Sequence, residues 1–401
     1  MTTFTPTTAE EALDAVRWAV SDEAPLEVVG NGTKRGIGRP AQTENAIDLS
    51  GLVGVTLYEP EELVLSARAG TPMAEIEALL ERNGQEFAFE PMDYSALLGG
   101  EPGKGTIGGA LAANLSGPRR VKAGAARDHV LGVHAVSGRG EAFKSGGRVV
   151  KNVTGYDLSK ALAGSWGTLA VVTDVTFKVL PRAETEATLV LRGLSEEQAA
   201  DAMALAMGSS GEVAGAAHLP ESVTGRVLDG ALKGRGSTLL RLEGFAPSVD
   251  YRFDRLAALL AGHGQAERLE AGVSKVLWRE IRDCAPFADG TQKPVWRVSM
   301  APSQGHRMVM ALRMAAAADA FYDWQGGLIW LRMEDDCEAA TVRALVAAHG
   351  GGHATLVRAA PAVRAAEAVF QPQPGPLAAL SARLKEQFDP KGILNPGRMG
   401  N

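Results

Sequence analysis

Apolar residues recur along this chain with two different spacings. Ala12, Val16 and Ala19 follow each other at helical intervals behind Thr8, a residue type that caps helix N-termini. The sequence therefore predicts one helix over 8–20 and a second over 73–83, the latter stopped by Gly84. Short apolar or alternating runs predict strands between and after these helices, at residues 26–29, 45–49, 53–58, 64–69 and 169–179.

The pattern changes after Pro181, where glycine thins out and longer amphipathic segments begin. These segments predict helices at residues 195–207, 248–261, 306–318, 339–349 and 376–387. Strands are predicted between them at residues 187–191, 237–243, 295–300 and 327–332. We interpret the chain as an α+β protein with an α/β-type N-terminal half. We expect three parts. Residues 1–182 form the first domain, and residues 183–375 form an α+β domain with an antiparallel sheet. Residues 376–401 form a C-terminal segment that returns to the first domain.

Composition narrows the possible partners and compartments. The 401 residues are 45% hydrophobic and 22% charged with a net charge of −6, and no long basic run favours nucleic acid. No apolar run reaches the ~18 residues of a membrane span, and the polar N-terminus does not resemble a signal peptide. Cys284 and Cys337 lie too far apart for a CxxC site. We expect a cytoplasmic protein that meets a membrane only through partners.

Glycine is concentrated before residue 170 and marks three loops. The chain has 47 glycines, and the loops span 30–36, 105–117 and 164–169. Glycine lets the backbone approach a ligand closely, and free N–H groups in such loops receive anions, above all where a helix starts. The first loop is not a Rossmann fingerprint, because Arg35 stands at the third glycine position. Taken alone, any one of these loops is also explained as a glycine-rich turn that binds no ligand.

Four segments in this order and spacing resemble the FAD-binding domain of the vanillyl-alcohol-oxidase and p-cresol-methylhydroxylase type. They are 28–36 (VVGNGTKRG), 105–117 (GTIGGALAANLSG), 151–158 (KNVTGYDL) and 164–169 (GSWGTL). The closing motif 388–399 (FDPKGILNPGRM) is also similar to that family, whereas residues 183–375 match it loosely. The resemblance implies a two-subdomain FAD-binding domain followed by a cap domain.

The same resemblance implies where FAD lies. The family holds the diphosphate at the first loop, the isoalloxazine ring and ribityl chain near 105–117, and the adenine and ribose near 164–172. Covalent members carry a histidine where Thr33 stands, so the implied FAD is dissociable. The matching positions are Gly30, Asn31, Gly32, Thr33, Lys34, Pro91, Thr106, Gly108, Gly109, Asn114, Ser116, Gly117, Gly124, Arg127, Gly167, Thr168, Val172 and Asn395.

Catalytic groups are harder to find than cofactor loops. Catalytic 2-hydroxy-acid oxidoreductases of this superfamily carry a metal site with two histidines and a later base histidine, and we find neither pattern. We therefore expect no metal. Candidates for other roles are Tyr156 or Asp157 as a base and Arg297 or Arg332 as the ligand of a substrate carboxylate. An arginine at such a strand end more commonly faces solvent.

Three functions remain open. The first is an FAD-carrying subunit of a multisubunit oxidase of a small 2-hydroxy acid such as glycolate. In that case a second FAD- and metal-bearing subunit would be catalytic, and an iron–sulfur subunit would take the electrons. The second is a self-sufficient FAD-dependent oxidase or dehydrogenase of a substrate such as D-lactate. The third is a non-catalytic scaffold. The glycines at the cofactor positions argue against it, because glycine costs conformational entropy on folding and a scaffold without a cofactor gains nothing in return.

Overall fold

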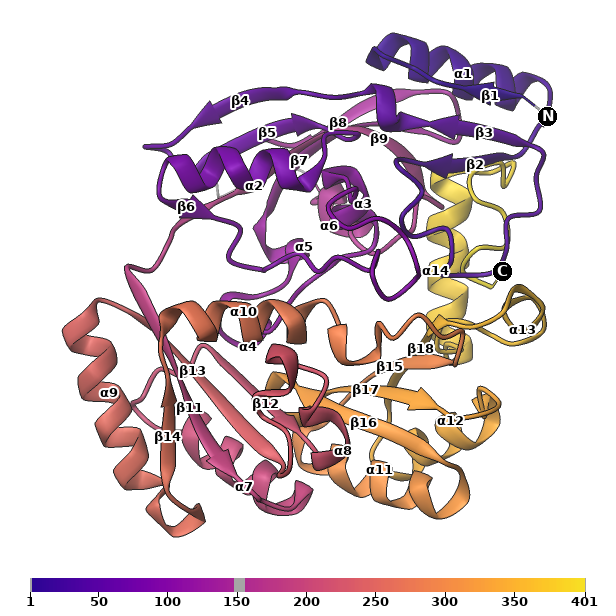
Figure 1. The fold of residues 1–401 in the computed structure, drawn as a ribbon. Helices are drawn as coiled ribbons and strands as arrows, with labels where there is room; N and C mark the ends of the chain where they lie inside the picture. Colours follow the sequence, from indigo (N-terminus) through magenta and orange to yellow (C-terminus); the bar gives the residue numbers. More distant parts are fainter. Residues whose placement is uncertain (1, 148–155, 401) are drawn as a thin grey trace. The chain divides into compact units, whose positions relative to one another are not determined.

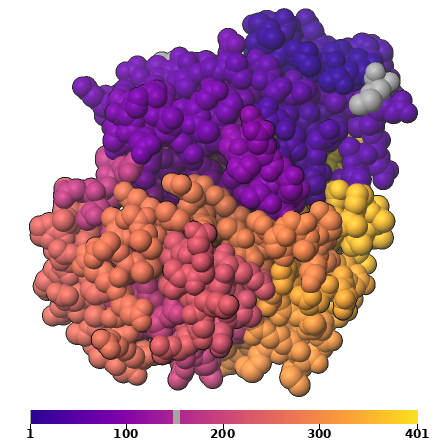
Figure 2. All heavy atoms as spheres, in the orientation of Figure 1, coloured from indigo at the N-terminus to yellow at the C-terminus, as the bar shows by residue number. Residues whose placement is uncertain are grey.

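The computed structural model describes residues 2–147 and 156–400, which fall into two compact units (Figure 1). The first unit comprises Met1–Ser116, Gly124–Arg182 and Pro372–Asn401. The second comprises Gly117–Ala123 and Ala183–Gln371, so a short piece of the N-terminal region packs with the later part of the chain. Side chains fill the spaces between the ribbons of each unit (Figure 2). Residues 151–155 of the third family-like segment lie outside the described residues.

A small parallel sheet begins the first unit, in the order β1-β3-β2. Helix α1 (Ala9–Ser21) starts where Thr8 accepts a hydrogen bond from the N–H of Glu11, so the cap predicted from the sequence is confirmed. The apolar stripe of α1 packs on this sheet and on Leu394 of the C-terminal tail. The strands are β1 (Thr3–Phe4), β2 (Leu26–Val29) and β3 (Asn45–Asp48).

A five-stranded antiparallel sheet forms the main layer of the first unit, in the order β4-β5-β9-β7-β8. Its core packs against α2, α3 and the aromatic pair Phe87 and Phe89. The strands are β4 (Val55–Glu59), β5 (Val64–Arg68), β7 (Val130–Ser137), β8 (Ala142–Gly146) and β9 (Ala170–Lys178). The helices are α2 (Met73–Arg82), α3 (Ile107–Ala112), α5 (Ala126–His129), α6 (Leu158–Leu162) and α14 (Gly375–Phe388). A short antiparallel pair, β6 (Gln85–Glu86) and β10 (Leu180–Pro181), completes this unit.

The second unit is one eight-stranded antiparallel sheet with helices, in the order β14-β11-β13-β12-β16-β17-β15-β18. Two apolar clusters pack its strands against α7 and α9 and against α11 and α12. The strands are β11 (Thr185–Arg192), β12 (Gly215–Leu219), β13 (Ser237–Gly244), β14 (Ala266–Leu269), β15 (Val295–Met300), β16 (Ala318–Asp323), β17 (Leu328–Met333) and β18 (Gly352–Arg358). The helices are α4 (Arg120–Ala123), α7 (Glu196–Met207), α8 (Glu221–Thr224), α9 (Ala246–Leu259), α10 (Ala271–Arg282), α11 (Pro302–Ala315), α12 (Ala339–Ala348) and α13 (Pro361–Ala366).

The α+β class and the antiparallel sheet of the later half are confirmed. The prediction of an α/β-type N-terminal half is correct only for the small parallel sheet, because the larger sheet of this half is antiparallel. Antiparallel neighbours joined by short turns, such as β4 with β5 and β7 with β8, need no crossover helix. Among the described residues, no helix combines the length and apolarity needed to cross a bilayer.

Candidate FAD site

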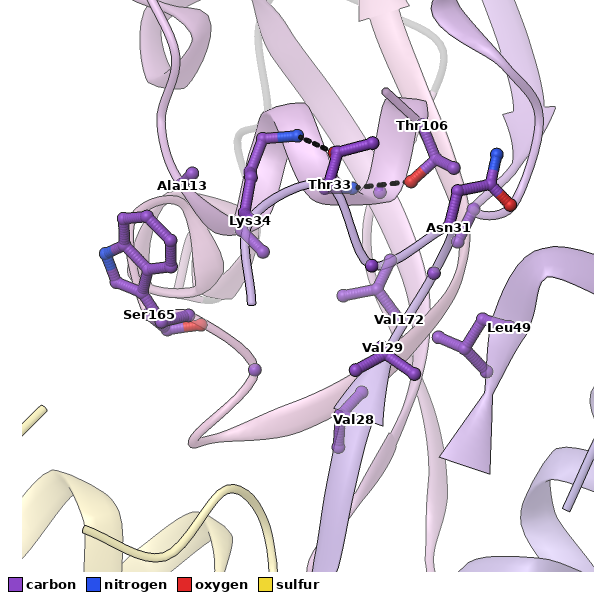
Figure 3. A pocket seen from close by; sticks show the side chains of 18 of the residues that line it. Val28, Val29, Asn31, Thr33, Lys34, Leu49, Thr106, Ala113, Ser165 and Val172 are labelled. Atoms are coloured by element: carbon purple, nitrogen blue, oxygen red, sulfur yellow. Dashed lines mark hydrogen bonds between the residues drawn. The ribbon is translucent and has the colours of Figure 1, made fainter. Parts of the chain in front are cut away.

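A pocket opens in the first unit at the end of β2 (Figure 3). One side is polar and carries Thr33, Lys34 and Thr106, while Val29, Leu49 and Val172 give the other side an apolar surface. The lining residues are Val28, Val29, Gly30, Asn31, Gly32, Thr33, Lys34, Arg35, Leu49, Ala69, Thr106, Gly108, Gly109, Ala112, Ala113, Leu162, Ser165, Trp166, Gly167, Ala170, Val172 and Arg398. A long ligand with flat apolar and charged parts suits such a lining.

The first glycine loop is folded so that its backbone donors stay available. Gly32 has φ +70°, a left-handed conformation that a side chain would strain. The Arg35 guanidinium closes the loop by pairing with Glu27, a buried carboxylate on β2. Among the described residues, the four consecutive backbone N–H groups of residues 31–34 have no hydrogen-bond acceptor. Successive free N–H groups around a left-handed residue form a concavity that binds anions.

The second glycine loop uses its N–H groups internally. At the start of α3, the N–H groups of Ile107 and Gly108 donate to the carbonyls of Thr71 and Ala69. The N–H of Gly109 donates to Oγ1 of Thr106 at 3.2 Å. These three N–H groups are therefore not available to an anion, because groups of the protein accept their hydrogen bonds. The available donors belong to the first loop.

Packing within the protein also explains why a glycine stands at position 108. A Cβ at this position would lie 2.8 Å from both the Cβ and the carbonyl oxygen of Ala69 on the neighbouring segment. Gly108 is thus required for α3 to approach the chain that follows β5, and it also lines the pocket. By contrast, a Cβ at Gly109 would lie 3.3 Å from the Lys34 ammonium nitrogen, so this glycine leaves room for that side chain.

The C-terminal tail connects β2 and the first glycine loop with the 164–167 loop. Asn395 accepts a hydrogen bond from the N–H of Val28 at 2.8 Å and donates one to the carbonyl of Trp166 at 2.8 Å. Its own backbone is left-handed, with φ 44°. Arg398 donates to the carbonyl of Lys34 at 2.8 Å, and its guanidinium carbon lies 5.6 Å from the centre of the Trp166 ring. One short segment therefore fixes β2, the first loop and the 164–167 loop together.

Lys34 gives the pocket its distinctive charge. Its ammonium makes one hydrogen bond, to Oγ1 of Thr33 at 3.3 Å, and no ion pair among the described residues. Burial lowers the pKa of Lys34 to about 8, although the nearby Asp93 carboxylate opposes the shift. Burial alone would raise the pKa of Asp93, but hydrogen bonds from Ser95 and Gly103 lower it. Asp93 therefore stays ionised at neutral pH without forming a contact pair with Lys34.

Ten of the predicted cofactor residues line the pocket, and eight do not. Those that line it are Gly30, Asn31, Gly32, Thr33, Lys34, Thr106, Gly108, Gly109, Gly167 and Val172. Those outside the lining are Pro91, Asn114, Ser116, Gly117, Gly124, Arg127, Thr168 and Asn395. Several of these hold the chain instead: Asn114 Oδ1 accepts from the N–H of Arg127, and Ser116 Oγ accepts from the N–H of Ala126. Gly117 packs in the second unit, where its carbonyl accepts from Trp324.

Sequence reasoning missed part of the lining. Arg35, Trp166 and Arg398 are the largest of these residues, and all three lie in segments with a sequence signal, namely 28–36, 164–169 and 388–399. The apolar positions Leu49, Ala112 and Leu162 carry no motif, because any core residue of their size gives the same sequence signal. For Arg398, the sequence signal was its position within the closing motif 388–399.

The two candidate arginines of the second unit differ in their partners. Arg332 is buried and its guanidinium contacts three carboxylates, those of Asp289, Asp319 and Glu334. Arg297 is half-buried over the ring of Trp324 and has no ion pair or hydrogen bond among the described residues. Tyr156 is 90% exposed. Arg297 is therefore the better placed of the two arginines to meet an external carboxylate.

We expect Arg332→Met to lower the stability of the second unit by about 2 kcal/mol, because it removes the cation that bridges two half-buried carboxylates. Asp319 then keeps only Arg226, and Asp289 keeps only the more distant Arg358. Arg297→Met loses a ring contact and is expected to cost less than about 1 kcal/mol. Thermal unfolding of both variants measures the difference. Equal shifts in melting temperature would show that the carboxylate cluster around Arg332 is not structural.

No group of three or more histidine, cysteine or acidic side chains able to hold a metal ion occurs within residues 2–147 and 156–400. His218 is buried beside Thr238, and burial lowers its pKa to about 3, so it is neutral at physiological pH.

Comparison with known proteins defines the class first. Residues 2–146 match the model of the FAD binding domain family. The fold is similar to that of p-cresol methylhydroxylase with substrate bound, with a TM-score of 0.73 over 99% of this chain and 88% of that one, at 13% identity. The chain is an FAD-dependent oxidoreductase, and FAD is its cofactor.

The particular family follows from closer relatives. The chain is 36% identical over 395 residues to glycolate oxidase subunit GlcE of Escherichia coli (strain K12), covering 98% of this chain and 97% of that protein. It therefore belongs to the GlcE family. Glycolate oxidase subunit GlcD of Bacillus subtilis (strain 168) is 34% identical over 132 residues, which is 33% of this chain and 26% of that subunit.

Proposed function

We propose that this chain is the FAD-binding subunit of a multisubunit glycolate oxidase, in which glycolate becomes glyoxylate and a partner iron–sulfur subunit takes the electrons. The observation that carries the proposal is the pocket at the end of β2. It has an ammonium, apolar walls and N–H groups that find no acceptor in the part of the chain that the structure describes. The relatives support the substrate, since the GlcE and GlcD proteins are named as glycolate oxidase subunits.

The residues of the pocket fit FAD on structural grounds. The 31–34 N–H groups and Lys34 suit the diphosphate, and Val28, Val29 and Leu49 suit an aromatic ring system. Bound FAD supplies the redox chemistry, and the protein supplies position and electrostatics. Thr106 caps the start of α3 through the N–H of Gly109, and Asn395 holds β2 against the 164–167 loop.

The partners follow from what the chain lacks and from its relatives. The sequence has two cysteines, Cys284 and Cys337, both buried, and ligation of an iron–sulfur cluster needs more thiolates. An FAD- and metal-bearing subunit similar to GlcD would supply the base and metal, and any association with a membrane would be indirect. A self-sufficient oxidase is the second candidate. It is favoured by the guanidinium of Arg297, which has no ion pair or hydrogen bond within residues 2–147 and 156–400.

The function is tested by omission. The chain is co-expressed with the GlcD-like and iron–sulfur subunits encoded in the same organism, and glycolate-dependent dye reduction is measured with and without it. The proposal requires that leaving this chain out abolishes activity and that all three proteins copurify. Full activity of the other two subunits without this chain would overturn it.

We expect purified protein to be yellow and to release its flavin on acid precipitation, because Thr33 has no nucleophilic imidazole to bond the cofactor. The supernatant should contain FAD, identified by chromatography and by its absorbance spectrum. Flavin that remains with the denatured pellet would show a covalent link and contradict this expectation.

A further inference from the structure

The polar side of the pocket carries three cationic side chains with different surroundings. Arg35 is paired with Glu27, and this pairing raises its pKa. Arg398 lies 4.0 Å from the same carboxylate and donates to a backbone carbonyl. Lys34 has a single neutral partner, the Thr33 hydroxyl. Within the described residues, Lys34 is therefore the pocket cation whose charge no contacting carboxylate balances.

Lys34 also lies beside unused donors. Its own N–H and those of the three residues before it have no acceptor in the described structure. The ammonium lies next to Gly105 and Gly109, where the missing side chains leave it space toward the pocket. A buried ammonium with one long hydrogen bond is costly unless a ligand completes its shell.

FAD has one part that matches this arrangement. Its ring systems are uncharged in the oxidised state, whereas its diphosphate carries two negative charges and several acceptor oxygens. We propose that the Lys34 ammonium is the counter-charge of the FAD diphosphate, and that the protein holds FAD more weakly once this ammonium loses its proton. The inference rests on the proposed FAD site and adds the group that controls retention.

The charged groups around Lys34 set the direction of the effect. Asp93 faces it from the 91–95 segment and favours the ammonium, while Arg35 and Arg398 are held by Glu27 and by the Lys34 carbonyl. Burial without FAD lowers the pKa of Lys34 to about 8, and a bound diphosphate would raise it again. Below pH 8 the ammonium is already present. Above pH 8, binding must take up a proton, so the Kd for FAD should rise by up to about tenfold per pH unit.

The test measures the Kd of FAD for the apoprotein between pH 6.5 and 9.5 by flavin fluorescence quenching. Lys34→Met should raise the Kd roughly ten- to hundredfold at pH 7 and remove most of the pH dependence. Lys34→Arg keeps the charge and should shift the loss of affinity to higher pH. The matched control is Lys104→Met, since Lys104 is a surface lysine outside the pocket that pairs with Glu101.

The outcomes separate this inference from the proposed function. FAD binding by Lys34→Met with wild-type affinity and pH dependence would overturn the role of Lys34 while leaving the FAD site intact. An equal effect of Lys104→Met would overturn it too. Wild-type apoprotein that fails to bind FAD at any pH would instead refute the proposed site. If Lys34→Met does not fold, Lys34→Arg decides, because an unchanged pH profile in that variant contradicts the proposal.

Discussion

Alone, this chain is expected to reduce dye with glycolate at a rate about two to four orders of magnitude below that of the complete complex. Oxidising a 2-hydroxy acid requires a positioned base for the hydroxyl proton, and general acid–base catalysis contributes roughly 10²- to 10⁴-fold. The described residues hold no three-residue metal cluster, and Tyr156 is exposed to solvent. Steady-state dye reduction by the FAD-loaded chain, with and without its partners, measures the difference.

The contrary result has a clear meaning. Robust turnover of glycolate or D-lactate by the isolated, metal-free chain would favour the self-sufficient oxidase. Arg297→Met would then be the first variant to make, because its guanidinium is available to a carboxylate. Arg307→Met, an exposed arginine on α11, is its matched control. A rise in KM in the first variant alone would identify Arg297 as the substrate contact.

Asn395→Ala is expected to abolish FAD retention and to destabilise the first unit by about 4 kcal/mol. The change removes the hydrogen bonds that Asn395 makes with the N–H of Val28 and the carbonyl of Trp166, at about 1–3 kcal/mol each. It also forces alanine into a left-handed backbone with φ 44°. Melting temperature should fall by roughly 10 °C, and flavin absorbance per protein should fall to near zero.

Two further variants separate the causes. Asn395→Gly keeps the left-handed backbone without strain and should lose less stability than alanine, while FAD retention stays impaired. Asn395→Asp keeps an acceptor for the N–H of Val28 but loses the donor to Trp166. Normal flavin content and melting temperature in Asn395→Ala would mean that the tail does not organise the pocket.

Gly32 and Gly108 show that a glycine motif does not by itself distinguish a ligand contact from packing within the protein. The sequence singles out Gly32 and Gly108 alike as places where backbone meets a ligand. In the structure, Gly32 is left-handed in a loop whose N–H groups at 31–34 have no acceptor among the residues described, whereas Gly108 is packed closely against Ala69. A valine at Gly108 would therefore act through a clash inside the protein as well as in the pocket, so loss of FAD in that variant is weak support for a contact with FAD.

The sequence by itself determined the periodic elements and the order of the cofactor loops. Local patterns decide these features: Thr8 caps α1 through its own hydroxyl, and the alternating run 169–179 becomes β9, Ala170–Lys178. The same patterns predicted the antiparallel sheet of the later half. They missed α10, Ala271–Arg282, whose apolar stripe surrounds the buried Trp278.

Tertiary structure alone decided which donors are available and which charges are balanced. Nothing local to residues 105–109 shows that Ala69 and Thr71 take the first N–H groups of α3. Nothing local to Arg297 and Arg332 shows that three carboxylates surround only the second. Asn395 reaches Val28 across 367 residues of sequence. These properties depend on contacts between distant segments, and a hydrogen bond or ion pair is decided by the atoms that meet, whatever the spacing along the chain.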